Sequence, residues 1–136
     1  MSEYAGAFLT FEGIDGSGKT TQLELLTNRL EAAGYSVVRA QEPGGTRVGR
    51  EIRRILLDAA SSDLRAMPEL LLYFASRAQN VEEVILPALR SGRVVVADRF
   101  TDASVAYQGF GRGLGFETVA ALDQIVPRGL KPDLTF

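Results

Sequence analysis

FEGIDGSGKTTQ, at residues 11–22, decides the fold, because it joins an apolar run to a helical pattern through a glycine-rich loop. Residues Gly13 to Thr20 match G-x-x-x-x-G-K-[ST] at every fixed position. Glycines let the backbone curl so that successive N–H groups point inward, and the following helix adds the positive end of its dipole. The stretch therefore predicts a loop that binds nucleotide phosphates, with Lys19 on the β- and γ-phosphates and the Thr20 hydroxyl on Mg²⁺.

The segments around this loop alternate between strand and helix patterns. The helix predicted from Pro68 is expected to bend at Pro87 and to end by Gly92. Short strands alternating with helices predict an α/β fold, in which a mainly parallel sheet has helices on both faces in three layers (α/β/α). Strands are predicted at residues 7–11, 35–40, 93–98 and 133–136, and helices from Lys19, through Ile52, from Pro68 and over 116–126.

The strand predicted at 133–136 reaches the last residue of the chain. A parallel strand of this kind is normally covered by helices on both faces. We therefore expect residues 1–136 to be the N-terminal portion of a single domain, with its C-terminal part missing.

Composition excludes several classes of function. Hydrophobic residues make up 46% of the 136 residues and the net charge is −2, which predicts a folded core and no basic surface for nucleic acid. The absence of Cys and His excludes disulfides, Cys/His zinc sites and histidine acid–base chemistry. The N-terminus lacks a signal-peptide pattern, and no run approaches the ~18 apolar residues of a membrane span. The sequence therefore predicts a soluble cytoplasmic protein that binds no membrane.

An acid and an arginine end the third predicted strand, in VVVADRF at 94–100. Ligands bind beyond the carboxyl ends of strands in open α/β sheets, so Asp98 is a candidate second ligand of Mg²⁺. Arg99 suggests a second anion, such as the phosphate of an acceptor. The alternative is an ordinary exposed Asp-Arg pair at a strand end.

A second arginine falls within an apolar helical stripe. Leu70, Phe74, Val81 and Ile85 define one face of the helix from Pro68, and Arg77 lies inside that face with Tyr73 one turn earlier. A buried guanidinium must be paired or face a cavity, where it suits planar acceptors, and a nearby ring offers a base a stacking surface. The alternative is an arginine that packs its stem and extends its charge to solvent.

These features together resemble the thymidylate kinase family, whose members phosphorylate dTMP with ATP. The resemblance covers nearly the whole chain and rests on five stretches in order: FEGIDGSGKTTQ, EPGGT, LLYFASRAQ, DRFTDASVAYQGFGRGL and KPDLTF. It implies the fold of the P-loop nucleoside-monophosphate kinases, ATP as phosphate donor with Mg²⁺, and a homodimer. The resemblance places Asp15 on the 3′-hydroxyl of the acceptor sugar, Arg53 and Arg99 on phosphate, and Arg77 on thymine O4.

Other site residues follow from the same resemblance. Tyr73 stands in place of a stacking Phe, with Phe74 next to it, so either ring is a candidate to stack on the base. Ser104 and Gln108 would read the thymine edge from one face of a helical stretch over 101–108, with Tyr107 beside the sugar. The implied catalytic residues are Lys19, Asp98 and Arg99, and the metal ligands Thr20 and Asp98. The implied ATP-binding residues are Gly13, Ile14, Asp15, Gly16, Ser17, Gly18, Lys19, Thr20 and Thr21.

One departure from some family members concerns charge. Some members carry a basic residue among the variable positions of the phosphate loop, but residues 14–17 of this chain include none. The resemblance implies that members without this residue supply the charge from a lid after the fourth strand. Two alternatives stay open. The chain could be a kinase for another nucleoside monophosphate or a deoxynucleoside. It could also be a non-enzymatic nucleotide switch, although a guanine-reading N-K-x-D sequence is absent from these 136 residues.

Overall fold

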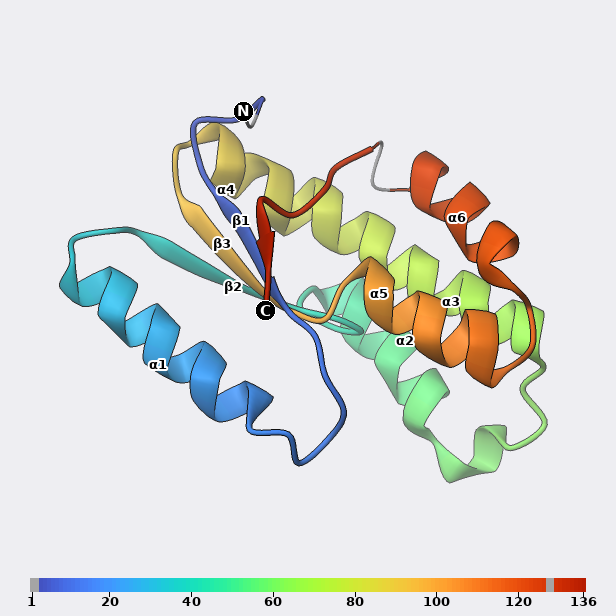
Figure 1. Cartoon of the computed structure of the whole chain (residues 1–136). Coiled ribbons are helices and arrows are strands. Elements are labelled where there is room, and N and C mark those ends of the chain that lie inside the picture. The colour runs from blue at the N-terminus through green and yellow to red at the C-terminus, as the bar shows by residue number, and fades with distance from the viewer. Residues whose placement is uncertain (1–2, 127–128) are drawn as a thin grey trace.

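The computed structural model describes residues 3–126 and 129–136 and contains a parallel four-stranded sheet (Figure 1). Its strands are β1 (Phe8–Phe11), β2 (Val37–Gln41), β3 (Val94–Asp98) and β4 (Leu134–Thr135), in the order β2-β3-β1-β4. The register pairs Asp98 with both Phe11 and Gln41, so three strands end at the same level. The loops that follow these strands therefore meet at one edge of the sheet.

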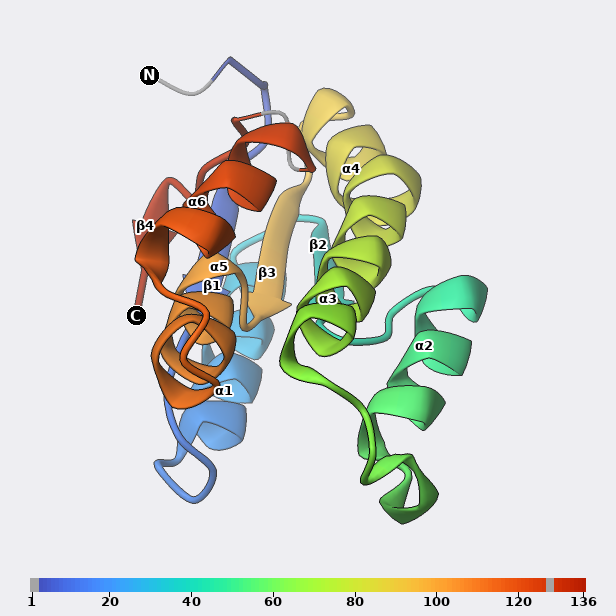
Figure 2. The ribbon, with the colours of Figure 1, turned by 90° about the vertical axis from the view of Figure 1, so that its right-hand side faces the viewer.

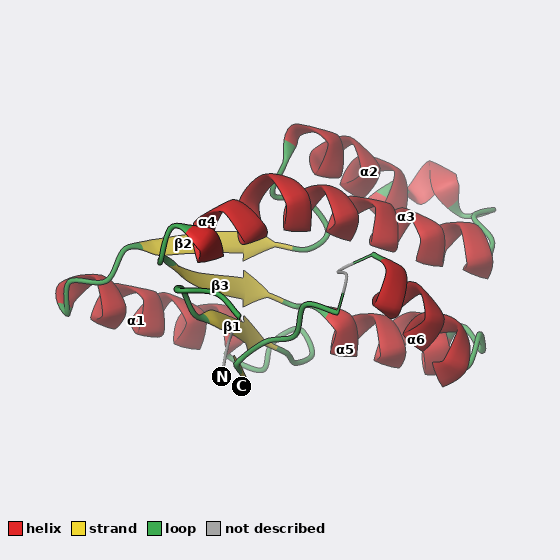
Figure 3. Cartoon of the chain, turned by 90° about the horizontal axis from the view of Figure 1, so that it is seen from above, coloured by secondary structure: helices red, strands yellow, loops and turns green. Residues whose placement is uncertain are grey.

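Helices cover both faces of the sheet, which confirms the three-layer prediction (Figure 3). On one face, Leu23 of α1 packs against Phe11 and Val96. On the other face, Ile85 and Leu89 pack with strand residues that include Val95. The α-helices are α1 (Lys19–Ala32), α2 (Arg47–Leu57), α3 (Ala66–Asn80), α4 (Leu86–Arg90), α5 (Thr101–Ser104) and α6 (Phe116–Ile125). A short 3₁₀ turn spans Ala59–Ser61, and none of the described helices is long and apolar enough to cross a membrane.

The long helix predicted from Pro68 is interrupted rather than simply bent. It begins at Ala66, so Pro68 lies in its first turn as predicted, and a π-helical segment at Val81–Ile85 separates α3 from α4. Pro87 has no N–H to donate to the carbonyl four residues earlier, and its ring crowds that carbonyl. A wider π turn immediately before Pro87 accommodates this.

A second layer of contacts lies beyond the strand ends. Helix α2 packs against α3 away from the sheet (Figure 2). Leu70 and Phe74 of α3 form a core cluster with Val119 of α6. A π-helical segment at Val105–Gly111 continues α5 and packs on α6. These contacts hold α2, α3 and α5 around the edge where the three strands end.

Candidate functional site

The glycine-rich loop adopts backbone conformations that only glycine takes readily. Gly16 has φ 79° and Gly18 has φ 85°, both in the left-handed region. Gly18 precedes α1, and no side chain caps the N-terminus of that helix. The first N–H groups of a helix need an acceptor, and the helix dipole favours an anion there. The loop therefore fits a bound phosphate chain.

Lys19 and Asp98 meet at the floor of the site. Lys19 Nζ lies 2.6 Å from Asp98 Oδ1, and the Thr20 side chain lines the same cavity. A hydroxyl and a carboxylate are hard oxygen ligands of the kind Mg²⁺ takes, together with waters and substrate phosphates. In residues 3–126 and 129–136 no three His, Cys, Asp or Glu residues cluster as a metal site. The ligand set thus fits a magnesium ion carried by a nucleotide better than a metal held by protein alone.

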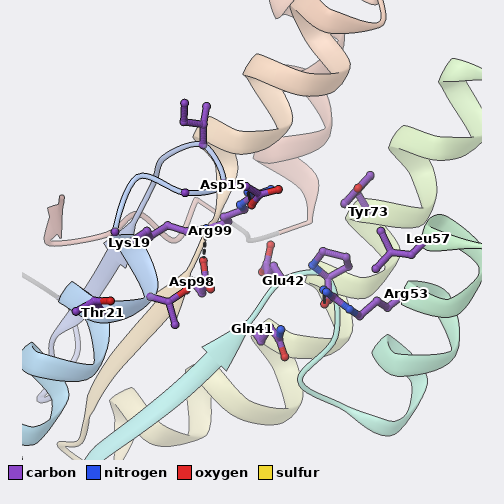
Figure 4. Close-up of a pocket in the computed structure, with 15 residues that line it drawn as sticks. Asp15, Lys19, Thr21, Gln41, Glu42, Arg53, Leu57, Tyr73, Asp98 and Arg99 are labelled. Carbon is purple, nitrogen blue, oxygen red and sulfur yellow. Dashed lines mark hydrogen bonds and ion pairs between the residues drawn. The ribbon is translucent and has the colours of Figure 1, made fainter.

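Two adjoining cavities open at this edge of the sheet. The larger, about 530 Å³, has the phosphate loop on one side and Arg53, Leu57 and Tyr73 on the other (Figure 4). The smaller, about 20 Å³, shares Glu42, Pro43, Tyr73 and Arg99 with the first. Its remaining lining residues are Arg77, Phe100, Ala103, Ser104, Tyr107 and Gln108.

Arg77 is buried at the back of the smaller cavity, with 2% of the residue exposed. Its Nε donates to Glu42 Oε2 at 2.7 Å, and its Nη2 donates to the Phe100 carbonyl and to Ser104 Oγ, both at 2.9 Å. Nη1 has no hydrogen-bond partner among the residues that the structure describes. The exposed, snorkelling alternative is excluded, and one donor of a fixed guanidinium is left for a ligand.

Glu42 is a site residue that sequence reasoning missed. Burial raises the pKa of its carboxyl, and the Arg77 guanidinium offsets part of that rise. The apolar stripe around Arg77 indicated that a partner was needed, but Glu42 lies 35 residues away in the chain, so no local pattern identified it.

Arg99 takes an unusual backbone conformation at the end of β3. Its φ of 69° is the only positive value among non-glycine residues in the described part of the chain. Its guanidinium contacts the Asp15 carboxylate at 2.9 Å and lies over the Tyr107 ring, 5.2 Å from the centroid. Strained backbone of this kind concentrates at functional sites.

The structure brings most of the predicted residues together, with three exceptions. Asp15, Arg53, Tyr73, Arg77, Arg99, Ser104, Tyr107 and Gln108 line the two cavities, as do Ile14, Gly16, Gly18, Lys19, Thr20, Thr21 and Asp98. Phe74 does not line either cavity. It packs in the core with Leu70 and beneath Arg77, 4.7 Å from the guanidinium carbon, so Tyr73 is the ring at the cavity wall. Gly13 and Ser17 also lie outside the lining.

Two further acids at this site were not predicted. Glu12 Oε1 accepts a hydrogen bond from the Phe100 backbone N–H at 2.7 Å, and burial raises the pKa of Glu12. Glu69 Oε1 accepts from Gln108 Nε2 at 3.2 Å. Ser104 and Gln108, four residues apart, are both buried and face one cavity as the helical spacing predicts.

Comparison with known proteins identifies one family. The family model for thymidylate kinase matches residues 11–136. A thymidylate kinase from Pelobacter propionicus is 58% identical over 96% of this chain and 59% of its own length, and one from Exiguobacterium sibiricum is 53% identical over 96% and 62%. The crystal structure of a thymidylate kinase from Ehrlichia chaffeensis superposes with a TM-score of 0.89 at 40% identity, covering 96% of this chain and 73% of that one. The chain spans about three fifths of the length of these curated relatives.

Proposed function

The chain belongs to the thymidylate kinase family, and we propose that its protein transfers the γ-phosphoryl group of ATP to dTMP, giving dTDP and ADP. The observation that carries the proposal is the free Nη1 donor of Arg77, in a guanidinium fixed by three other hydrogen bonds. A buried donor without a partner costs about 1–3 kcal/mol. A planar base with a carbonyl at this position, such as thymine with its O4, offsets that cost.

The surroundings of Arg77 support a pyrimidine. Tyr73 offers a ring on the wall shared by the two cavities, on which a base can stack. Ser104 and Gln108 supply further polar atoms beside Arg77. The smaller cavity is narrow, at about 20 Å³, so side chains that line it have to move for a base to enter.

Charges in the larger cavity support two phosphate-bearing ligands. Arg53 lines this cavity opposite the phosphate loop, and Arg99 lines it beside the loop. Both would hold the 5′-phosphate of dTMP. Asp15 is paired with Arg99 and would accept a hydrogen bond from the 3′-hydroxyl of the deoxyribose. The glycine-rich loop and Lys19 would hold the phosphates of ATP.

The chemistry asks the protein mainly for positioning and charge neutralisation. A 5′-phosphate oxygen of dTMP forms a bond to the γ-phosphorus as the bond from that phosphorus to the β,γ-bridging oxygen breaks and ADP leaves. That attacking oxygen is already an anion at neutral pH, so no general base is required. Mg²⁺ bound with ATP, held by Thr20 and Asp98, would supply a Lewis acid for the developing charge. Lys19 and Arg99 stabilise the same charge from the protein.

An acceptor panel tests the proposal. The purified protein is incubated with labelled ATP and, in turn, dTMP, dUMP, dCMP, AMP and thymidine, and phosphorylated product is quantified. We expect dTMP to give the highest rate. A matched pair of variants follows: Arg77→Ala should lower the rate with subsaturating dTMP, whereas Arg54→Ala, at a side chain 78% exposed on α2, should not. Preference for another acceptor would overturn the proposal.

Three further features are proposed from family membership. The protein acts in the cytoplasm on small molecules, it forms a homodimer, and the extra cation absent from residues 14–17 comes from a lid that residues 1–136 do not include. Its net charge of −2 argues against a nucleic-acid partner. Sedimentation equilibrium tests the dimer: twice the mass of one chain is expected, and a single-chain mass at micromolar concentration contradicts it.

A further inference from the structure

The side-chain amide of Gln108 is held in one orientation by a carboxylate. Gln108 Nε2 lies 3.2 Å from Glu69 Oε1. An ionised carboxylate only accepts hydrogen bonds, so the NH₂ end of the amide must face Glu69 and the carbonyl end is turned away from it. Within residues 3–126 and 129–136, Gln108 Oε1 accepts no hydrogen bond, and Gln108 lines the smaller cavity. The amide therefore has an acceptor available for a ligand.

This orientation distinguishes the two pyrimidine edges. Thymine presents the O4 acceptor next to the N3–H donor, whereas cytosine presents the N4 amino donor next to the N3 acceptor. The cavity offers the Arg77 Nη1 donor and the Gln108 Oε1 acceptor, which complement thymine at both positions. If the amide turned over, its NH₂ group would meet the N3–H of thymine and would suit the N3 acceptor of cytosine instead.

We propose that Glu69 is a positioning residue for pyrimidine specificity, because it fixes the Gln108 amide with its carbonyl directed to the base. This inference rests on the proposed function, since it assumes that the smaller cavity binds the base of the acceptor. Glu69 itself needs no contact with the ligand. Its effect is exerted through the amide that it orients.

Contacts on its other side keep Glu69 in place. Glu69 lies in the first turn of α3, where the helix dipole favours a negative charge. Its Oε2 is 3.6 Å from Arg112 Nη2, and that same nitrogen donates to the Leu64 carbonyl at 2.8 Å. The side chain is 22% exposed. The carboxylate is thus held between Arg112 on the outside and Gln108 on the inside.

A Glu69→Gln variant tests the proposal with little change in shape. The new amide can either accept from or donate to Gln108, so both orientations of the Gln108 amide become available. We expect the ratio of dTMP to dCMP affinity, measured by calorimetric titration, to fall about tenfold, with dTMP binding weakened only a few-fold. Arg77 still opposes the cytosine amino group, so discrimination is reduced rather than abolished.

The matched control is Glu83→Gln. Glu83 accepts a hydrogen bond from Gln79 at 2.7 Å in an exposed pair of the same chemistry, away from the two cavities. The ratio of dTMP to dCMP affinity of the Glu83→Gln variant should equal that of the parent. If Glu69→Gln does not fold, as judged by circular dichroism, Glu69→Ala also frees the amide and should shift the ratio in the same direction.

The outcomes separate the two proposals. A parent protein that does not prefer dTMP over dCMP contradicts the proposed function itself. A parent that does prefer dTMP, with Glu69 variants that keep the parental ratio or weaken both ligands equally, overturns the positioning role alone. A merely structural Glu69 would give that last result.

Discussion

The buried pair of Glu42 and Arg77 permits a quantitative prediction of coupling. Their side chains are 5% and 2% exposed and 2.7 Å apart. An Arg77→Met substitution leaves the Glu42 carboxylate buried without its partner, and breaking such a pair typically costs about 3–5 kcal/mol of unfolding free energy. Glu42→Gln leaves the guanidinium without a counter-charge and should cost about 2–4 kcal/mol.

The double variant should be less destabilised than the two single variants added together. With both charges gone, neither partner is left as an unpaired buried ion, so we expect the double variant to cost about 2 kcal/mol less than the sum. Urea unfolding at pH 7, followed by circular dichroism, gives the three free-energy differences. If the destabilisation of the double variant equals the sum of the two single variants to within about 0.5 kcal/mol, the two side chains do not act as a pair. That result would refute this account of how Arg77 is held.

Three other substitutions have predicted outcomes. Burial raises the pKa of Glu12 above 4.5, so the stability that its protonated form contributes is lost as pH rises through that raised pKa. Relative to the parent, Glu12→Gln should therefore gain unfolding free energy progressively above pH 4.5. If urea unfolding gives the same free-energy difference between variant and parent from pH 4 to 8, this prediction is wrong. Arg99→Gly relieves the backbone strain of a φ of 69°, worth about 1 kcal/mol of unfolding free energy, yet it should weaken dTMP binding about tenfold or more. The control Arg54→Gly, within α2, should only destabilise the fold. If both variants lower the melting temperature by similar amounts, the backbone at Arg99 is not strained. A Cβ on Gly6 would overlap the Arg93 carbonyl oxygen, so Gly6→Ala should lower the unfolding free energy by about 2 kcal/mol in thermal unfolding. The control Gly111→Ala should lower it by almost nothing. Equal losses for the two variants contradict this account.

The phosphate loop and the three-layer fold could be predicted because their signals are local. Glycine spacing before a helix specifies the loop, and apolar runs between helical patterns specify a parallel sheet. The position of Arg77 within the apolar stripe of Leu70 and Phe74 left two alternatives, a buried and an exposed guanidinium, and the structure shows the buried one. The sequence left both Tyr73 and Phe74 as candidates to stack on the base, and the structure places Phe74 in the core and Tyr73 at the cavity wall.

The partners of the buried polar groups could not be predicted, because they come from distant parts of the chain. Glu42 lies 35 residues from Arg77, Glu69 lies 39 from Gln108, and Glu12 lies 88 from the Phe100 N–H that it accepts. Each contact depends on how strands and helices meet in three dimensions. The two π-helical segments were missed for a different reason: buried side chains four residues apart, such as Val81 and Ile85, also share one face in an α-helix.

The central claim is that the cavity around Arg77 binds the base of dTMP. Calorimetric titration of the parent protein with dTMP and with dCMP, at fixed pH and salt, tests this claim without any substitution. The donor of Arg77 and the acceptor of Gln108 predict one dTMP per chain and an affinity for dCMP weaker on the order of a hundredfold. Equal affinities for the two nucleotides, or tighter binding of dCMP, would contradict the account.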